Sequence, residues 1–192
     1  MLTLYFAPGA SSMAVHIALH EIGAAFEGKP MSFKANDMQS PEFLKLNPAD
    51  QVPTLLIDGR PLTEVAGILF YLARRFPEAE LLPDDVEKQA HVVSWMSFIA
   101  SRLHPARRQG LDHARKVYGI ADTRLGRGWA AGERYSIADI HLFRLVWRLF
   151  NTLKPEPGTF PNLDAHYRRI MARPAVKTTI EMESAVGYEL PA

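Results

Sequence analysis

The sequence contains no cysteine. Disulfide bonds, thiolate metal sites and a thiol nucleophile carried by the protein itself are therefore excluded, and cysteine usage says nothing about the redox compartment. The sequence also lacks an excess of charge of one sign, because 22 basic and 21 acidic residues leave a formal net charge of +1. This balance draws the whole chain neither to nucleic acid nor to an anionic membrane, so we expect neither as a partner.

Long apolar runs are missing as well. None approaches the roughly 18 residues that a membrane-spanning helix requires. Residues 1–5 lead directly into a strand pattern, without the basic segment and cleavage site of a secretory signal peptide. The 192 residues, 47% hydrophobic and 22% charged, are typical of a globular chain with one large or two small domains. We expect a cytoplasmic protein.

The first part of the sequence mixes strand and helix patterns. Strand patterns and a hairpin turn at Asp58-Gly59 alternate with apolar residues at helical spacing. The expected elements are a strand at 3–6, a helix from Ser12, a weaker strand within 25–33, a short helix at 41–46, a hairpin over 52–63 and a helix from Glu64. This order predicts an α/β domain with a thioredoxin-like layout.

The second part of the sequence loses the strand patterns. Apolar residues at helical spacing over 92–103 predict an amphipathic helix, and 111–125 is a less regular helical segment. Ser136 and Asp139 have the spacing of a capping box, which opens a largely apolar central helix. We therefore expect an all-α C-terminal domain. The predicted limits are 1–77 for the thioredoxin-like domain, 78–85 for a linker and 86–192 for the helical domain.

Pro53 stands at the start of an apolar run, where a residue without an N–H would weaken a central strand. A cis Val52–Pro53 bond would explain the proline and turn the Val52 backbone outward, where it could pair with an extended peptide-like ligand. An ordinary trans proline that enters a strand is the common alternative.

The run Gln51-Val52-Pro53-Thr54-Leu55, followed by Leu62-Thr63-Glu64, closely resembles the glutathione-binding half of cytosolic glutathione transferases. Gly132-x-x-x-Ser136-x-Ala138-Asp139 and Ala172-Arg-Pro-Ala-Val resemble the later helices of this family, so the resemblance spans nearly the whole chain. It is nearest to the bacterial beta class. The resemblance implies the glutathione transferase fold, glutathione as co-substrate without a metal, and a homodimer whose partner chain completes part of the glutathione site.

The resemblance also implies roles for single residues. Val52, beside a cis Pro53, would pair with the cysteinyl part of glutathione, and Glu64 would bind the γ-glutamyl ammonium. Val65 stands where serine is usual, so only its backbone N–H could hold the γ-glutamyl carboxylate. Asn36 stands where some members have a lysine near the glycyl carboxylate. Further glutathione-binding positions are implied at Gly9, Ala10, Ser12 and Gln51.

The resemblance places catalysis at the turn before the first helix. After an opening like Tyr5-Phe6-Ala7-Pro8-Gly9-Ala10 the bacterial class has a cysteine, whereas this chain has Ser11. A mixed disulfide between protein and glutathione is therefore impossible, and the Ser11 hydroxyl would instead hydrogen-bond to the glutathione sulfur. Lowering a thiol pKa by two units from about 8.5 requires about 2.7 kcal/mol. A helix N-terminus, at roughly 0.3–1 kcal/mol, and a charge-assisted hydroxyl bond, at roughly 1.5–3 kcal/mol, could supply it together. Alternatively, Ser11 and Ser12 only cap the helix.

One histidine and one pair of histidines are candidates for a role in the chemistry. His104 ends the helical pattern in Ser101-Arg-Leu-His, where the resembling class often has a histidine that faces the sulfur. Its imidazole could assist proton removal or polarise an electrophile, and a surface histidine favourable to the helix dipole is the equal alternative. His16 and His20 have the spacing of a helical metal pair, but no third ligand follows in a recognisable spacing, so we expect no metal site.

The function that follows is conjugation of the glutathione thiolate to a small hydrophobic electrophile. Two alternatives stay open. The same thiolate could serve an isomerase, a dehalogenase or an etherase. A non-catalytic binding module with the transferase fold is compatible with the missing cysteine, with Val65 and with Asn36.

Overall fold

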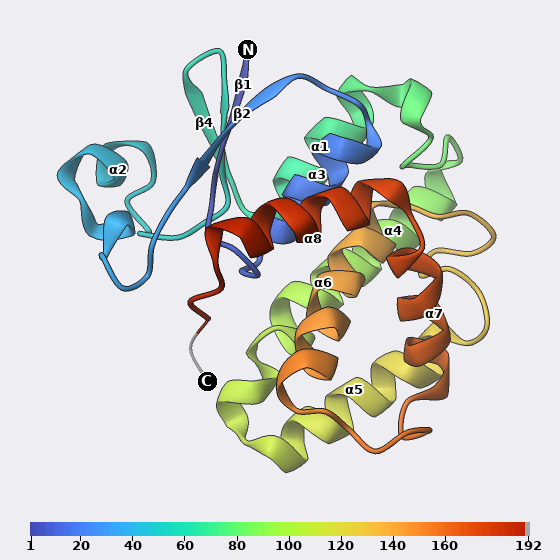
Figure 1. The fold of residues 1–192 in the computed structure, drawn as a ribbon. Coiled ribbons are helices and arrows are strands. Elements are labelled where there is room, and N and C mark those ends of the chain that lie inside the picture. Colours follow the sequence, from blue (N-terminus) through green and yellow to red (C-terminus); the bar gives the residue numbers. More distant parts are fainter. Residues whose placement is uncertain (191–192) are drawn as a thin grey trace. The chain divides into compact units, whose positions relative to one another are not determined.

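The computed structural model describes residues 1–190, and their contacts divide the chain into two compact units (Figure 1). The first unit contains Met1–Ala79 and the segment that begins at Pro174. The second unit is Glu80–Arg173. None of the helices formed by residues 1–190 combines the length and the apolar character that crossing a bilayer requires.

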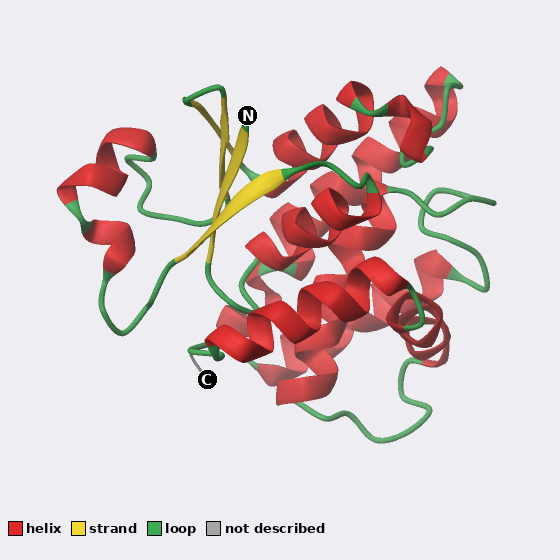
Figure 2. Ribbon diagram, turned by 45° about the horizontal axis from the view of Figure 1, so that its top comes forward, coloured by secondary structure: helices red, strands yellow, loops and turns green. Residues whose placement is uncertain are grey.

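The first unit is built on a four-stranded sheet with the strand order β2–β1–β3–β4, drawn in yellow in Figure 2. β1 (Leu2–Phe6) is parallel to β2 (Phe26–Pro30) and antiparallel to β3 (Thr54–Ile57). β3 turns through Asp58 and Gly59 into the antiparallel β4 (Arg60–Thr63). The weak pattern of β2 has a physical reason, because this edge strand is largely exposed and does not alternate between a buried and a solvated face.

Helices complete the first unit in the order that the sequence predicts. α1 (Ser12–Glu21) packs against α3 (Val65–Arg75), and both contribute fully buried side chains such as Ile17 and Ile68. α2 (Pro41–Leu46) lies in the connection between β2 and β3, after a 3-10 turn at Asp37–Gln39. This arrangement of strands and helices is a thioredoxin-like α/β fold.

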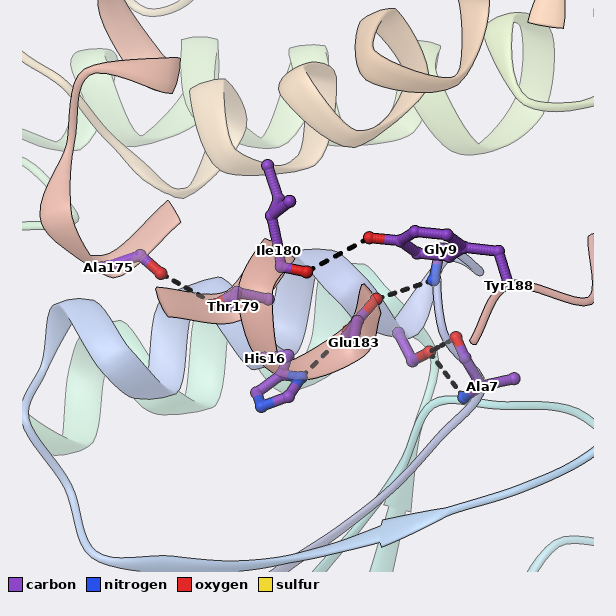
Figure 3. A network of polar contacts seen from close by, with 9 residues as sticks. Ala7, Gly9, His16, Ala175, Thr179, Ile180, Glu183 and Tyr188 are labelled. Carbon is purple, nitrogen blue, oxygen red and sulfur yellow. Dashed lines mark hydrogen bonds and ion pairs between the residues drawn. The ribbon is translucent and has the colours of Figure 1, made fainter. Parts of the chain in front are cut away.

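α8 (Pro174–Val186) follows the second unit in the sequence but packs against α1 of the first unit (Figure 1). Glu183 of α8 is fully buried there. The Gly9 N–H donates to Glu183 Oε2 at 2.6 Å, and Glu183 Oε1 lies 2.9 Å from Nδ1 of the buried His16, as Figure 3 shows. The domain limits predicted from the sequence placed this helix in the helical domain. Its contacts group it with the first unit, because the buried carboxylate finds its polar partners there.

The second unit is helical. Its elements are α4 (Val86–Phe98), a π-helical turn (Ile99–Leu103), a 3-10 turn (Pro105–Gln109), α5 (Leu111–Leu125), α6 (Ile137–Thr152) and α7 (Pro161–Met171). The helix predicted over 92–103 is regular only as far as Phe98 and then widens, so that the His104 N–H donates to the Ile99 carbonyl at 2.8 Å. Pro105 follows directly and has no N–H with which to continue a helical ladder.

The predicted capping box at the start of α6 is confirmed. Oδ2 of the fully buried Asp139 accepts hydrogen bonds from the Ser136 N–H at 2.9 Å and from the Ser136 hydroxyl at 3.0 Å. Oδ1 accepts from the Ala130 N–H at 2.7 Å and lies 3.0 Å from His166 Nε2 of α7. One carboxylate therefore joins the preceding loop, the first turn of α6 and α7.

Replacing Asp139 by alanine tests this role. The change leaves several buried polar groups without their hydrogen-bond partner, so we expect the free energy of unfolding to fall by about 3–5 kcal/mol. The measurement is urea unfolding followed by circular dichroism, with comparison of the m-values. Asp112→Ala is the control, because the Asp112 side chain is 98% exposed in its ion pair with Arg115, and we expect a change within about 0.5 kcal/mol. A loss below about 1 kcal/mol for Asp139→Ala would show that the carboxylate does not hold these segments together.

Candidate functional site

The loop between β1 and α1 is held in place from two sides. The Ser12 hydroxyl accepts from the Ala7 N–H and donates to the Ala7 carbonyl, both at 3.1 Å. On the other side, the Gly9 N–H donates to Glu183. Gly9 has φ of 71°, in the left-handed region where a side chain would be strained. These bonds fix the backbone that presents Ala10 and Ser11.

The Ser11 hydroxyl donates a hydrogen bond to the Val52 carbonyl at 2.9 Å. Ser11 occupies the N-cap position of α1 but makes no side-chain capping bond, and the Ser12 hydroxyl is bonded to Ala7. The structure therefore does not use either serine hydroxyl as a helix cap. It uses Ser11 to join the loop before α1 to the segment before β3.

The Val52–Pro53 peptide bond is cis. The bend that leads to it is tied by Asn47, which is 4% exposed. Asn47 Nδ2 donates to the Gln51 carbonyl at 2.7 Å and to Thr54 Oγ1 at 3.1 Å, while Oδ1 accepts from the Ala49 N–H at 3.1 Å. Sequence reasoning did not single out Asn47 as a positioning residue. An asparagine directly after a short helix and next to a proline was the available signal, because its amide readily bonds to a local turn.

Glu64 precedes α3 with φ of 67° and ψ of 123°, which is an uncommon conformation for a residue with a side chain. Such outliers cost about 1–3 kcal/mol and cluster at functional sites. The Glu64 side chain is exposed and does not cap α3, so the carboxylate is available to a ligand. Val65 begins the helix and its side chain is buried, which leaves its backbone as the polar group at this position.

The structure joins some of the predicted site residues directly. Ser11 is bonded to Val52, and Ala10 and Val52 belong to the same buried apolar cluster. Asn36 stands on a separate segment of the first unit, exposed and with φ of 56°. Glu64 likewise stands on a separate segment. The other predicted site residues adjoin these in the sequence: Gly9, Ser12, Gln51, Pro53 and Val65.

His104 lies in the second unit, between the π-helical turn and the 3-10 turn. Desolvation by the surrounding protein and then the positive charges of Arg144, Arg108 and Arg148 lower the pKa of its imidazole. The side chain is nevertheless exposed, so solvent reaches the ring. Because this lowered pKa lies below the neutral range, the His104 ring is uncharged at neutral pH. Its role in the chemistry stays a prediction.

His16 has a different partner from the one that its spacing suggests. Its ring lies 5.1 Å from the ring of His20, in a stacked arrangement, and its Nδ1 is bonded to Glu183. Burial and then the charge of His16 lower the pKa of His20. Among residues 1–190, no group of three or more potential ligand side chains is placed to hold a metal ion. Sequence reasoning missed the pair of His16 and Glu183, because the two residues are 167 positions apart.

Two family profiles match the chain. The profile for the N-terminal domain of glutathione S-transferases matches residues 1–74, and the profile for their C-terminal domain matches residues 89–174. Among curated proteins, glutathione S-transferase GST-4.5 of Xanthomonas campestris pv. campestris is 31% identical, with 94% of this chain and 98% of that protein covered.

Solved structures show the same similarity. A glutathione transferase from Methylococcus capsulatus superposes with a TM-score of 0.86 at 31% identity, and the superposition covers 96% of this chain and 100% of that chain. A glutathione transferase homologue from Sulfitobacter, solved with bound glutathione, superposes with a TM-score of 0.83 at 29% identity, over 95% and 98% of the two chains. Because the two domain profiles together cover most of its length, the chain belongs to the glutathione S-transferase family.

Proposed function

We propose that the protein conjugates glutathione, through its thiolate, to a small hydrophobic electrophile. The observation that carries this proposal is the bond of 2.9 Å between the Ser11 hydroxyl and the Val52 carbonyl. It places a hydroxyl donor at the N-terminus of α1 and next to the backbone that holds the cysteinyl part of glutathione in this family. The Sulfitobacter structure with bound glutathione supports the choice of co-substrate.

The tripeptide would be held by the first unit. The Val52 N–H and C=O would pair with the cysteinyl backbone, the Glu64 carboxylate would bind the γ-glutamyl ammonium, and the Val65 N–H would hold the γ-glutamyl carboxylate. Gly9, Ala10, Gln51 and Asn36 would line the same site, and the fully buried Ser12 would support it through its two bonds to Ala7. The strained backbone at Glu64 supports this assignment, because strain at an exposed charged residue is typical of a ligand-binding position.

Ionisation of the thiol requires the Ser11 hydroxyl to change its acceptor. A hydroxyl has one proton to donate, so Ser11 must leave the Val52 carbonyl when it donates to the sulfur. The exchange replaces a neutral bond, at about 0.5–1.5 kcal/mol, with a charge-assisted bond, at about 1.5–3 kcal/mol. With about 0.3–1 kcal/mol from the N-terminus of α1, the net gain lowers the thiol pKa by about one to two units. A substantial fraction of bound glutathione would then be thiolate at neutral pH.

The chemical step is a nucleophilic attack of this thiolate. The thiol proton passes to solvent, and the sulfur donates an electron pair to an electrophilic carbon of the second substrate. Either a leaving group departs with the electron pair of its bond to that carbon, or the π pair of an activated double bond shifts to the neighbouring atom, which then takes a proton from solvent. The neutral His104 imidazole would polarise the electrophile or accept a proton. We further propose that the active protein is a homodimer in which the partner chain completes part of the glutathione site, as the family resemblance implies.

Glutathione binding is tested by thermal-shift titration. We expect millimolar glutathione to raise the melting temperature of the parent protein. Glu64→Gln should weaken binding about tenfold or more, because it removes a charge-assisted bond to the ammonium. The control is Glu78→Gln at another exposed glutamate, which should bind like the parent. No shift in the parent protein would reject the proposal and favour the non-catalytic module.

The role of Ser11 is tested by ultraviolet absorbance of the bound thiolate against pH. In Ser11→Ala the thiol pKa should rise by about one unit toward its value in free glutathione, because the hydroxyl donor is lost. Ser11→Thr keeps a hydroxyl and should stay close to the parent. An unchanged thiol pKa in Ser11→Ala would remove Ser11 from this role.

The pH dependence of the rate tests the state of His104. Its lowered pKa means that the protonated form is disfavoured, so the ring stays neutral between about pH 6 and 8 and only the thiol titrates there. His104→Gln should therefore lower kcat without moving the apparent pKa of the rate profile. A parent profile with a second ionisation near the usual histidine value, lost in His104→Gln, would contradict this assignment.

A further inference from the structure

The segment after α8 folds back onto the first unit. The Ser32 hydroxyl donates to Glu189 Oε2 at 2.8 Å, and the backbone N–H of Lys34 donates to the same oxygen at 3.1 Å. The Tyr188 hydroxyl donates to the Ile180 carbonyl at 3.3 Å, as Figure 3 shows. Successive residues of the segment are therefore attached to a loop on one side and to α8 on the other.

The loop that receives Glu189 is organised by its own bonds. The Ser32 N–H donates to Asp37 Oδ2 at 2.7 Å, and the Ala35 N–H donates to the Ser32 hydroxyl oxygen at 3.0 Å. These bonds direct the Ser32 proton and the Lys34 N–H toward a common acceptor. The pKa of Glu189 lies below its ordinary value, because the Lys34 N–H and then the Ser32 hydroxyl stabilise the charged carboxylate. The loop is thus a small receptor for a carboxylate.

The apolar end of the segment covers a second surface. Leu190 packs against the buried cluster formed by Ala7, Ala10, Met38, Phe43 and Val52. Ala10 and Val52 are proposed glutathione contacts. The carboxylate receptor at 32–35 is directly followed by Asn36, the residue proposed near the glycyl carboxylate. The segment therefore contacts a cluster that contains two residues of the proposed tripeptide site and a loop that adjoins a third.

From these contacts we propose that residues 187–190 act as an intramolecular competitor of glutathione. The segment occupies the glycyl end of the site in the free protein and leaves when the tripeptide binds. This inference rests on the function proposed above. It adds a regulatory element to that site, since the chain's own carboxylate holds the place of a ligand carboxylate.

We take the glycyl carboxylate to use the donors of this loop, which makes the segment a competitor of the tripeptide and not a cover over the bound tripeptide. The two donors converge on one oxygen, and the Ser32 hydroxyl has only one proton to give. A ligand carboxylate that took these donors would also stand beside the negative charge of Glu189 and be repelled by it. Both carboxylates cannot share the loop, so one has to leave.

The size of the effect follows from population arithmetic. The apparent Kd equals the intrinsic Kd divided by the fraction of molecules in which the site is open. A few hydrogen bonds at a partly exposed position and the contact of Leu190 hold the segment only modestly, so release of the segment should tighten glutathione binding by about three- to tenfold.

The first test is titration calorimetry with glutathione on the full chain. Glu189→Ala removes the carboxylate and Leu190→Ala removes the apolar contact, and each should lower the apparent Kd by about three- to tenfold. The matched control is Glu181→Ala, an exposed glutamate on α8, which should leave the Kd unchanged. Weaker or unchanged binding in Glu189→Ala would overturn the proposal.

Amide hydrogen exchange supplies a readout that does not depend on affinity. The Lys34 amide should exchange faster in Glu189→Ala than in the parent, and residues 187–190 of the parent should exchange faster once glutathione is added. Glutathione binding without any change at 187–190 would overturn this inference and leave the proposed function standing. An absence of glutathione binding in both the parent and Glu189→Ala would overturn the proposed function and this inference together.

Discussion

A fully buried carboxylate, that of Glu183, sets the position of the loop that carries Ser11. A buried charge is costly unless it is hydrogen-bonded, and Glu183 meets this requirement through Gly9 on one oxygen and His16 on the other. α8 can therefore dock only where these two donors stand in the right places. In return, Glu183 favours the observed conformation of the loop before α1, since another conformation would lose the bond from the Gly9 N–H to Oε2 while His16 still contacts Oε1.

On this fixed backbone, one group is free to exchange partners. The Ser11 hydroxyl is attached to Val52 by a single bond that a ligand sulfur can replace at little cost, whereas Ser12 makes two bonds to Ala7. A rigid frame with one exchangeable donor suits the function proposed for this chain without cysteine, because in that reaction the sulfur comes from glutathione. The protein then only has to favour its charged form.

The sequence allowed prediction of the features that depend on neighbouring residues. The turn at Asp58 and Gly59 and the box between Ser136 and Asp139 involve short separations and side chains with a known local preference. The features it did not reveal join distant segments. Glu183 reaches His16 across 167 positions, and Glu189 reaches Ser32 across 157. A glutamate in a helical pattern gives no sign that it will be buried, because its partners are set by packing.

The attachment of α8 also orders events during synthesis. Chains emerge from the ribosome with the N-terminus first, and domains generally fold as units. Gly9 and His16 are made early, but the carboxylate that completes their bonding is the side chain of residue 183. The first unit can form its sheet while translation continues, yet the conformation of the loop between β1 and α1 is settled only when α8 has been synthesised and has docked.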